Sequence, residues 1–220
     1  MPLDSRPVRR VVASEDAPTS YDEWPGTIPP VATLLREGLD LPRGVTLLVG
    51  ENGSGKPTLV EAVAMAFGLS PEGGTRFARH TTYETESPLH QWIRLERSAG
   101  ATRWGFLLRA ETMHGYYTYL ADGHGGARDP DFHRLSHGEA EAALSFSAQI
   151  ALVGQLHDLG ADGAQVLCAT HSPLLAALPG AQILEVGEWG MRRTSYDDLE
   201  LVGHWRRYLD QPMRYLRHVL

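Results

Sequence analysis

The sequence predicts an α/β fold with a mostly parallel sheet flanked by helices. Three short runs rich in aliphatic and β-branched residues, at residues 45–49, 166–170 and 182–186, are typical of strands buried on both faces. Segments with helical spacing lie between them, and this alternation favours parallel strand pairing. We find no internal repeat and no low-complexity block.

The first elements are a helix and a strand, and a second helix follows. Val31, Leu34, Leu35 and Leu39 have the spacing of one helical face, and a turn precedes the strand at 45–49. After a glycine-rich turn, residues 58–67 again carry apolar side chains at helical spacing, and Gly68 closes this helix. Further elements are expected as strands at 91–97 and 104–109, a helix from Ser136 to Leu159, and the strands at 166–170 and 182–186.

Size and composition indicate one globular domain. The chain has 220 residues, of which 42% are hydrophobic and 21% are charged, and this excludes wholesale disorder. Residues 1–26 lack an apolar period, so we expect a flexible tail there and one domain over residues 27–220. No run reaches the roughly 18 apolar residues that span a bilayer, and the start lacks the apolar run of a signal peptide. The one cysteine, Cys168, forms no internal disulfide, so we expect a cytosolic protein.

The charge balance argues against nonspecific DNA binding as the main activity. Lys plus Arg total 20 against 27 Asp plus Glu, a formal charge of −7, whereas such binding depends on neutralising phosphates. The C-terminal helix is basic on one side, which we interpret as a solvated face. Its arginines are Arg206, Arg207, Arg214 and Arg217.

The most specific motif is the sequence GENGSGK at residues 50–56, between a predicted strand and a predicted helix. It fits the first seven positions of G-x-x-x-x-G-K-[ST], in which glycines let backbone N–H groups converge on phosphate oxygens and the lysine reaches the outer phosphates. Lys56 is the only lysine of the chain, at a position where a compact ammonium fits better than a guanidinium. The alternative is a glycine-rich turn without a ligand. The predicted nucleotide-binding residues are Gly50, Asn52, Gly53, Ser54, Gly55, Lys56 and Thr58.

The eighth position of the motif is Pro57. Proline lacks both the hydroxyl that ligates Mg²⁺ and the backbone N–H that donates to phosphate, although it is tolerated in a first helical turn. Proline also disfavours the α conformation at Lys56. Thr58 does not replace the missing hydroxyl, because one step along a helix turns the side chain by about 100°. We therefore expect weakened nucleotide binding that does not depend on Mg²⁺.

Four motifs occur in order along the chain: GENGSGK followed by TLVEA, LSHGE at residues 135–139, EAALS at 141–145, and ATHSP at 169–173. Together they resemble the ABC-type branch of the P-loop ATPases. More closely, the chain is similar to the small soluble bacterial predicted ATPases of the AAA family, which are relatives of the SMC-like ATPases. The resemblance covers the chain from Trp24 to the C-terminus.

This resemblance implies an ABC-type ATPase domain that binds ATP with Mg²⁺ and works as a nucleotide-dependent homodimer. Residues 50–56 would be the Walker A loop, and His171 the switch histidine that senses the γ-phosphate. Ser136, His137 and Gly138 would be the signature motif, which caps the γ-phosphate bound to the opposite subunit. Trp24 falls where such ATPases place an aromatic residue that stacks on adenine.

One family motif is absent from the sequence. In the family, a helix and a strand ending in Asp-Glu-Pro, the Walker B motif, separate the signature from EAALS, whereas here Ala140 joins Glu141 directly. We expect a central sheet without the Walker B strand, which leaves residues 166–170 with an unpaired edge or an improvised neighbour. The aspartate that orders Mg²⁺ and the glutamate that polarises water are also absent, so hydrolysis should be impaired.

The sequence therefore leaves three functions open. The first is an ATP-binding protein of the ABC-type, AAA-family kind, whose family reaction converts ATP to ADP and phosphate. The second is a degenerate module that binds nucleotide or a partner without hydrolysis. The third, with only the basic C-terminus in its favour, is an SMC-like ATPase associated with DNA repair. We predict no metal site: His133 and His137 have a suitable spacing, but no third ligand accompanies them.

Overall fold

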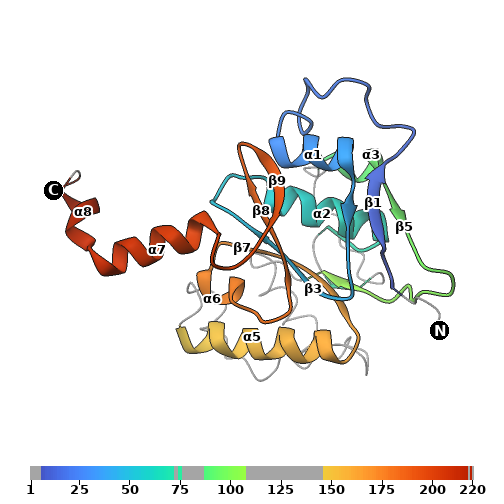
Figure 1. Cartoon of the computed structure of the whole chain (residues 1–220). Helices are drawn as coiled ribbons and strands as arrows, with labels where there is room; N and C mark the ends of the chain where they lie inside the picture. Colours follow the sequence, from blue (N-terminus) through green and yellow to red (C-terminus); the bar gives the residue numbers. More distant parts are fainter. Residues whose placement is uncertain (1–5, 72–73, 76–86, 108–145, 218, 220) are drawn as a thin grey trace.

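The computed structural model describes residues 6–71, 74–75, 87–107, 146–217 and 219 (Figure 1). These residues form a four-stranded sheet in the order β7-β3-β8-β9, a three-stranded sheet in the order β2-β1-β5, and a small pair, β4-β6. Helices flank the four-stranded sheet, so the predicted mixed α/β fold is confirmed. No helix in this part of the chain is long and apolar enough to cross a bilayer.

Three strands of the larger sheet are parallel, as the sequence predicts. The central strand β3 (Gly44–Val49) pairs in parallel with β7 (Gln165–Thr170) and with β8 (Gln182–Gly187). The strand β9 (Gly190–Thr194) adds an antiparallel edge beside β8. The strands expected at 45–49, 166–170 and 182–186 are thus present with boundaries shifted by one residue or less.

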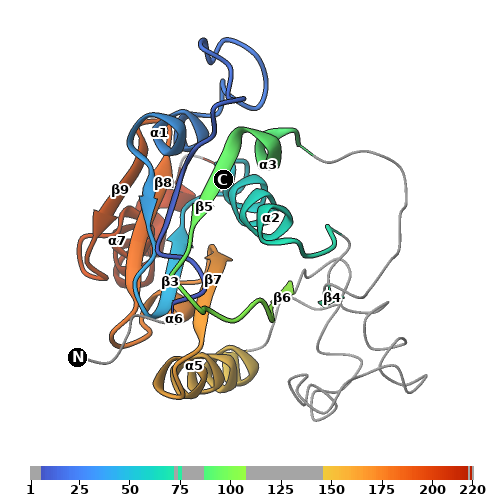
Figure 2. The same ribbon diagram turned by 90° about the vertical axis from the view of Figure 1, so that its right-hand side faces the viewer.

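The two faces of this sheet bury alternate residues of the same strands, which is the two-residue period of a strand. Leu48 and Leu184 pack on one face with α1 (Pro29–Glu37) and α2 (Lys56–Phe67). Leu47 and Ile183 pack on the other face with α5, α6 and the start of α7. Figures 1 and 2 show α1 and α2 on one side of the sheet and α5 on the other. The bounds are α5 (Phe146–Ala161), α6 (Pro173–Ala176) and α7 (Glu200–Asp210).

The three-stranded sheet corrects one prediction. The segment expected to be a flexible tail contains β1 (Arg10–Ala13), which pairs antiparallel with β2 (Leu39–Asp40) and β5 (Ile93–Glu96). Val11 on β1 is fully buried. A four-residue strand has too little pattern to be recognised alone, and here its stability comes from partners 28 to 86 residues away along the chain.

The remaining helices and strands agree with the sequence only in part. The helix expected from Ser136 is described from Phe146, where α5 begins, and residues 136–145 lie outside the described chain. The strand expected at 104–109 is described as β6 (Phe106–Leu107), which pairs with β4 (Gly74–Thr75). A short helix, α3 (Leu89–Trp92), precedes β5.

The C-terminal helices extend away from the body of the molecule (Figure 1). Val202, near the start of α7, is the last fully buried residue of the described chain. After α7, a second helix, α8 (Pro212–Leu216), follows a break at Gln211. We call the described residues after Val202, which are residues 203–217 and 219, the C-terminal arm.

Candidate phosphate-binding site

The loop of residues 50–56 joins the end of β3 to the start of α2, in the strand–loop–helix context that the motif requires. Gly50 lies so close to β8 that a Cβ atom there would be 2.3 Å from the carbonyl oxygen of Val186. Gly53 and Gly55 have positive φ angles of 82° and 84°, which other residues rarely adopt. A Cβ on Gly55 would also meet the side chain of Ile28 at 2.5 Å. The glycines are therefore required by the backbone path.

Lys56 is folded back into this loop. Its Nζ donates hydrogen bonds to the carbonyl oxygens of Gly50 (2.7 Å) and Glu51 (2.6 Å) and to Oγ of Ser54 (3.2 Å). The residue is only 5% exposed. Burial lowers the pKa of its ammonium group, and the nearby Glu51 carboxylate acts in the opposite direction. The only lysine of the chain is thus held at the loop by neutral oxygens, which bind it less strongly than a phosphate would.

The N-terminus of α2 has no side-chain cap in the described structure. The helix begins at Lys56, so the proline that follows has not displaced the first turn. The first N–H groups of a helix have no partner within it, and together with the helix dipole they favour an anion. Pro57 removes one of these donors and is exposed, and Thr58 beside it is half-buried.

The residues present fit the phosphate groups of a nucleotide but do not fit Mg²⁺. The loop supplies glycines with suitable conformations, an uncapped helix terminus and an ammonium group. For Mg²⁺, the hydroxyl expected next to Lys56 is replaced by the pyrrolidine ring of Pro57. In the part of the chain that the structure describes, no three His, Cys, Asp or Glu side chains gather to hold a metal ion.

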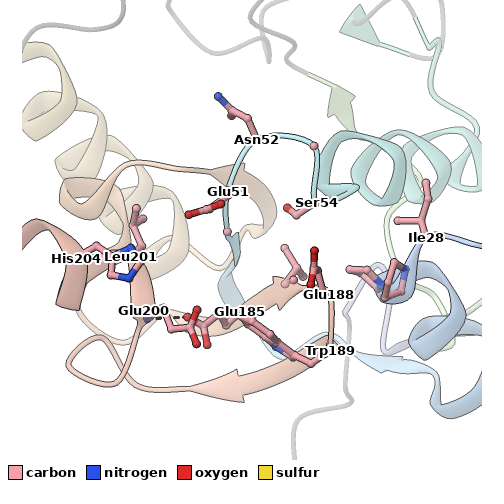
Figure 3. Close-up of a pocket in the computed structure, with 16 residues that line it drawn as sticks. Ile28, Glu51, Asn52, Ser54, Glu185, Glu188, Trp189, Glu200, Leu201 and His204 are labelled. Carbon is pink, nitrogen blue, oxygen red and sulfur yellow. Dashed lines mark hydrogen bonds between the residues drawn. The ribbon is translucent and has the colours of Figure 1, made fainter. Parts of the chain in front are cut away.

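A cavity of about 360 Å³ borders the loop on the side of β8, the turn that follows β8, and α7 (Figure 3). Figure 3 shows the side chains of Glu51, Glu188, Glu200 and Trp189 around it. Carboxylates therefore dominate the polar part of its wall, which disfavours phosphate groups in the cavity itself. The lining residues are Ile28, Pro29, Pro30, Gly50, Glu51, Asn52, Gly53, Ser54, Glu185, Val186, Gly187, Glu188, Trp189, Glu200, Leu201 and His204.

Glu185 on β8 connects three elements at the base of this cavity. The residue is 3% exposed, and its carboxylate accepts hydrogen bonds from Nε and Nη2 of Arg192 on β9, at 2.9 and 2.6 Å. It also accepts the backbone N–H of Glu200, the first residue of α7, at 2.8 Å. The Arg192 guanidinium in turn lies 4.6 Å from the centre of the Trp189 ring. Because the buried carboxylate bonds both Arg192 and the Glu200 N–H, it fixes the start of α7 against the sheet.

The structure brings some of the predicted site residues together. Gly50, Asn52, Gly53 and Ser54 line the cavity, whereas Gly55, Lys56 and Thr58 belong to the same loop and helix without lining it. His171 is exposed and directly follows β7, whose last residue Thr170 pairs with Val49, so it lies at the same edge of the sheet as the loop. Trp24 is 55% exposed and does not line the cavity. Ser136, His137 and Gly138 lie outside the described residues.

The wall opposite the loop is not predicted from the sequence. Glu185 carried a signal, because a carboxylate within the apolar run QILEV must find a partner when the strand is buried. Trp189 and His204 carried none, since they reach the cavity from the turn between β8 and β9 and from α7 only after the chain has folded.

The strand β7 has one described neighbour. Among the strands that the structure describes, only β3 pairs with it, so no Walker B strand is described on its other edge. The Ala140–Glu141 junction lies outside the described residues. Cys168 on β7 is partly buried, and burial raises the pKa of its thiol to about 11.

The comparisons with known proteins concern this same strand–loop–helix unit. Residues 35–110 match the family model described as an AAA domain. The matched segment contains β3, the loop and α2, and it ends before His171 and before the strands β8 and β9. No curated protein matches the chain. The match supports a relationship to AAA-like P-loop ATPases and suggests a nucleotide-binding function.

Proposed function

We propose that this protein binds ATP through residues 50–56 and belongs to the ABC-type, SMC-like branch of the P-loop ATPases. The observation that carries the proposal is the geometry of the loop between β3 and α2. Its glycines adopt the conformations that a phosphate cradle needs, and Lys56 is held beside them by neutral oxygens. The family-model match to residues 35–110 includes this whole unit.

In this proposal, phosphate oxygens bind at the uncapped N-terminus of α2. The backbone N–H groups of the loop and the first helical turn donate to them, apart from position 57, which has no N–H. Lys56 exchanges its carbonyl partners for phosphate oxygens, which returns a partly desolvated ammonium to an anionic partner. His171 is proposed to sense the γ-phosphate, and residues 136–138 are proposed to cap the γ-phosphate bound to the opposite subunit, as in the family that the chain resembles.

Hydrolysis of ATP to ADP and phosphate is the family reaction, and we propose that this chain performs it poorly. Phosphoryl transfer depends almost wholly on positioning and charge stabilisation. Here Pro57 removes the Mg²⁺ hydroxyl, and the sequence has no Asp-Glu pair after an apolar strand. A nucleotide-dependent homodimer and a cytosolic location remain predictions.

Two other functions have support in the sequence. A non-hydrolysing nucleotide-binding or interaction module is favoured by Pro57 and by the Ala140–Glu141 junction. An SMC-like ATPase associated with DNA repair has only the arginine-rich C-terminus in its favour.

The proposal is tested by titration with fluorescently labelled ATP, with and without Mg²⁺. We expect saturable binding to the purified chain, and Lys56→Ala should raise the dissociation constant at least ~10-fold, because it removes the only ammonium at the loop. Arg36→Ala, which removes an exposed cation from the last turn of α1, is the matched control and should bind as the wild type does. Equal affinity in Lys56→Ala and the wild type would refute the site.

A further inference from the structure

The C-terminal arm presents apolar side chains that the described part of the chain leaves exposed. Beyond Val202 every described residue of α7 and α8 is at least partly exposed. Half of the large hydrophobic side chains that are exposed in the described chain lie on this arm. They are Trp205, Tyr208, Leu209, Met213, Tyr215 and Val219.

The aromatic side chains of the arm pack against one another. Tyr208 lies edge-on to both Trp205 and Tyr215, with ring centroids 6.5 and 5.8 Å apart. Nε of Arg207 donates to the Tyr215 hydroxyl at 3.3 Å. Short helices such as α7 and α8 are marginal in water without tertiary packing. An ordered, exposed aromatic cluster on such a segment is typical of an interaction surface.

The arm and the rest of the chain have opposite charge. The arm contains four arginines and one acidic residue, Asp210, whereas the whole chain has a formal charge of −7. Arg206 is paired with Asp197, which precedes the arm, at 2.7 Å. Within the described chain, Arg207 and Arg214 have no recorded carboxylate partner. A partner surface for this arm should therefore be both apolar and acidic.

The cavity beside the phosphate loop is a surface of that kind. Ile28, Pro29 and Trp189 supply apolar wall, and Trp189 is 48% exposed. Figure 3 shows the Glu188 carboxylate pointing into the space between Ser54 and Trp189, and among the described residues it has no ion-pair partner. A guanidinium already sits against this wall, because Arg192 lies over the Trp189 ring and bonds Glu185.

We propose that the C-terminal arm docks on this acidic cavity in a second copy of the chain, and that the second arm docks reciprocally on the first. The first turn of α7, with Glu200, Leu201 and His204, itself lines the cavity, so the arm leaves the body beside the surface it would bind. Two copies related by a two-fold axis can then satisfy both contacts at once. Pairing of arm on arm would instead bring the arginines of two copies together.

A charge-exchange pair of variants tests this proposal without nucleotide. Variant one carries Arg207→Glu and Arg214→Glu in the arm, and variant two carries Glu188→Lys in the cavity. Each alone should have its dimer dissociation constant raised at least ~10-fold by like-charge contacts. An equimolar mixture should regain the dimer, because both reciprocal contacts are then between opposite charges. Sedimentation velocity over a concentration series measures the dimer dissociation constants of the two variants and of their mixture. Circular dichroism checks that each variant is folded.

The controls carry the same charge changes elsewhere. Arg36→Glu with Arg103→Glu, and Glu15→Lys, alter exposed residues outside the arm and the cavity and should leave the dimer unchanged. A wild-type chain that stays monomeric at 100 µM, which is about the upper range of weak assembly, would overturn the proposal. So would a dimer that is insensitive to both charge variants but lost in Leu209→Asp, since that result indicates arm-on-arm packing.

Discussion

At the scale of single residues, Pro57 governs the proposed phosphate binding by the loop at residues 50–56. It is exposed in the first turn of α2, an uncapped turn in which a serine would supply both a hydroxyl and a backbone N–H. Lys56 on one side and Thr58 on the other keep their places in the helix, so the defect is confined to one position.

Pro57→Ser should therefore make ATP binding depend on Mg²⁺. We expect affinity with Mg²⁺ to exceed affinity in a chelator by at least ~10-fold, whereas the wild type should show a ratio close to one. Isothermal titration calorimetry gives both values. Pro57→Ala is the control, because it restores the N–H without the hydroxyl and should raise affinity equally with and without Mg²⁺. If serine and alanine behave alike, the hydroxyl argument is wrong.

At Gly50, the space left by neighbouring residues permits no side chain. Gly50→Ala should lower the free energy of unfolding by ~1–3 kcal/mol, because its Cβ would lie 2.3 Å from the carbonyl oxygen of Val186 and would force β3 and β8 apart. Urea denaturation measures this. Gly154→Ala on α5 is the matched control, since an added Cβ there would meet no described residue within 4 Å outside its own stretch of helix, and alanine favours a helix by up to ~1 kcal/mol. Similar losses at both glycines would contradict the prediction.

At the scale of elements, Glu185 joins β8, β9 and α7. Glu185→Ala removes the acceptor for both Arg192 and the Glu200 N–H, and we expect it to lower the free energy of unfolding by ~1–3 kcal/mol. The half-exposed Arg192 side chain can rehydrate, which limits the loss. Glu185→Gln keeps an acceptor for the helix N–H and should lose less. If Glu185→Ala and Glu185→Gln lose equal free energy in thermal or urea unfolding, the hydrogen bond from the Glu200 N–H contributes nothing to stability.

The elements also show where sequence reasoning succeeds. The unit of β3, loop and α2 was predicted because a buried apolar strand, spaced glycines and a helical period are all local signals. β1 was missed because its four residues become a strand only through pairing with β2 and β5. The antiparallel edge β9 was missed for the same reason, since it depends on β8.

At the scale of the whole molecule, hydrolysis of ATP requires that a phosphate-binding loop, Mg²⁺ ligands and a group that polarises water, all from different parts of the chain, meet around the nucleotide. We expect phosphate release by the wild type to stay at the level of Lys56→Ala, because the sequence has no Asp-Glu pair directly after an apolar strand to polarise the attacking water. Pro57→Ser should bind ATP better and still release no phosphate above that level. A malachite-green assay measures this, and turnover from the single serine substitution would show that another group replaces Walker B.

The sequence by itself determined the α/β class, the parallel core strands and the phosphate loop with its lone lysine and its proline, because these depend on local conformation and on patterns within a few turns of chain. Only the tertiary structure decided the acidic cavity and the exposed arm. The cavity combines residues 28–30, 50–54 and 185–189 with residues 200, 201 and 204, which no local pattern relates to one another. The arm is exposed because α7 leaves the sheet after Val202, and burial is a property of the packed chain rather than of the helix.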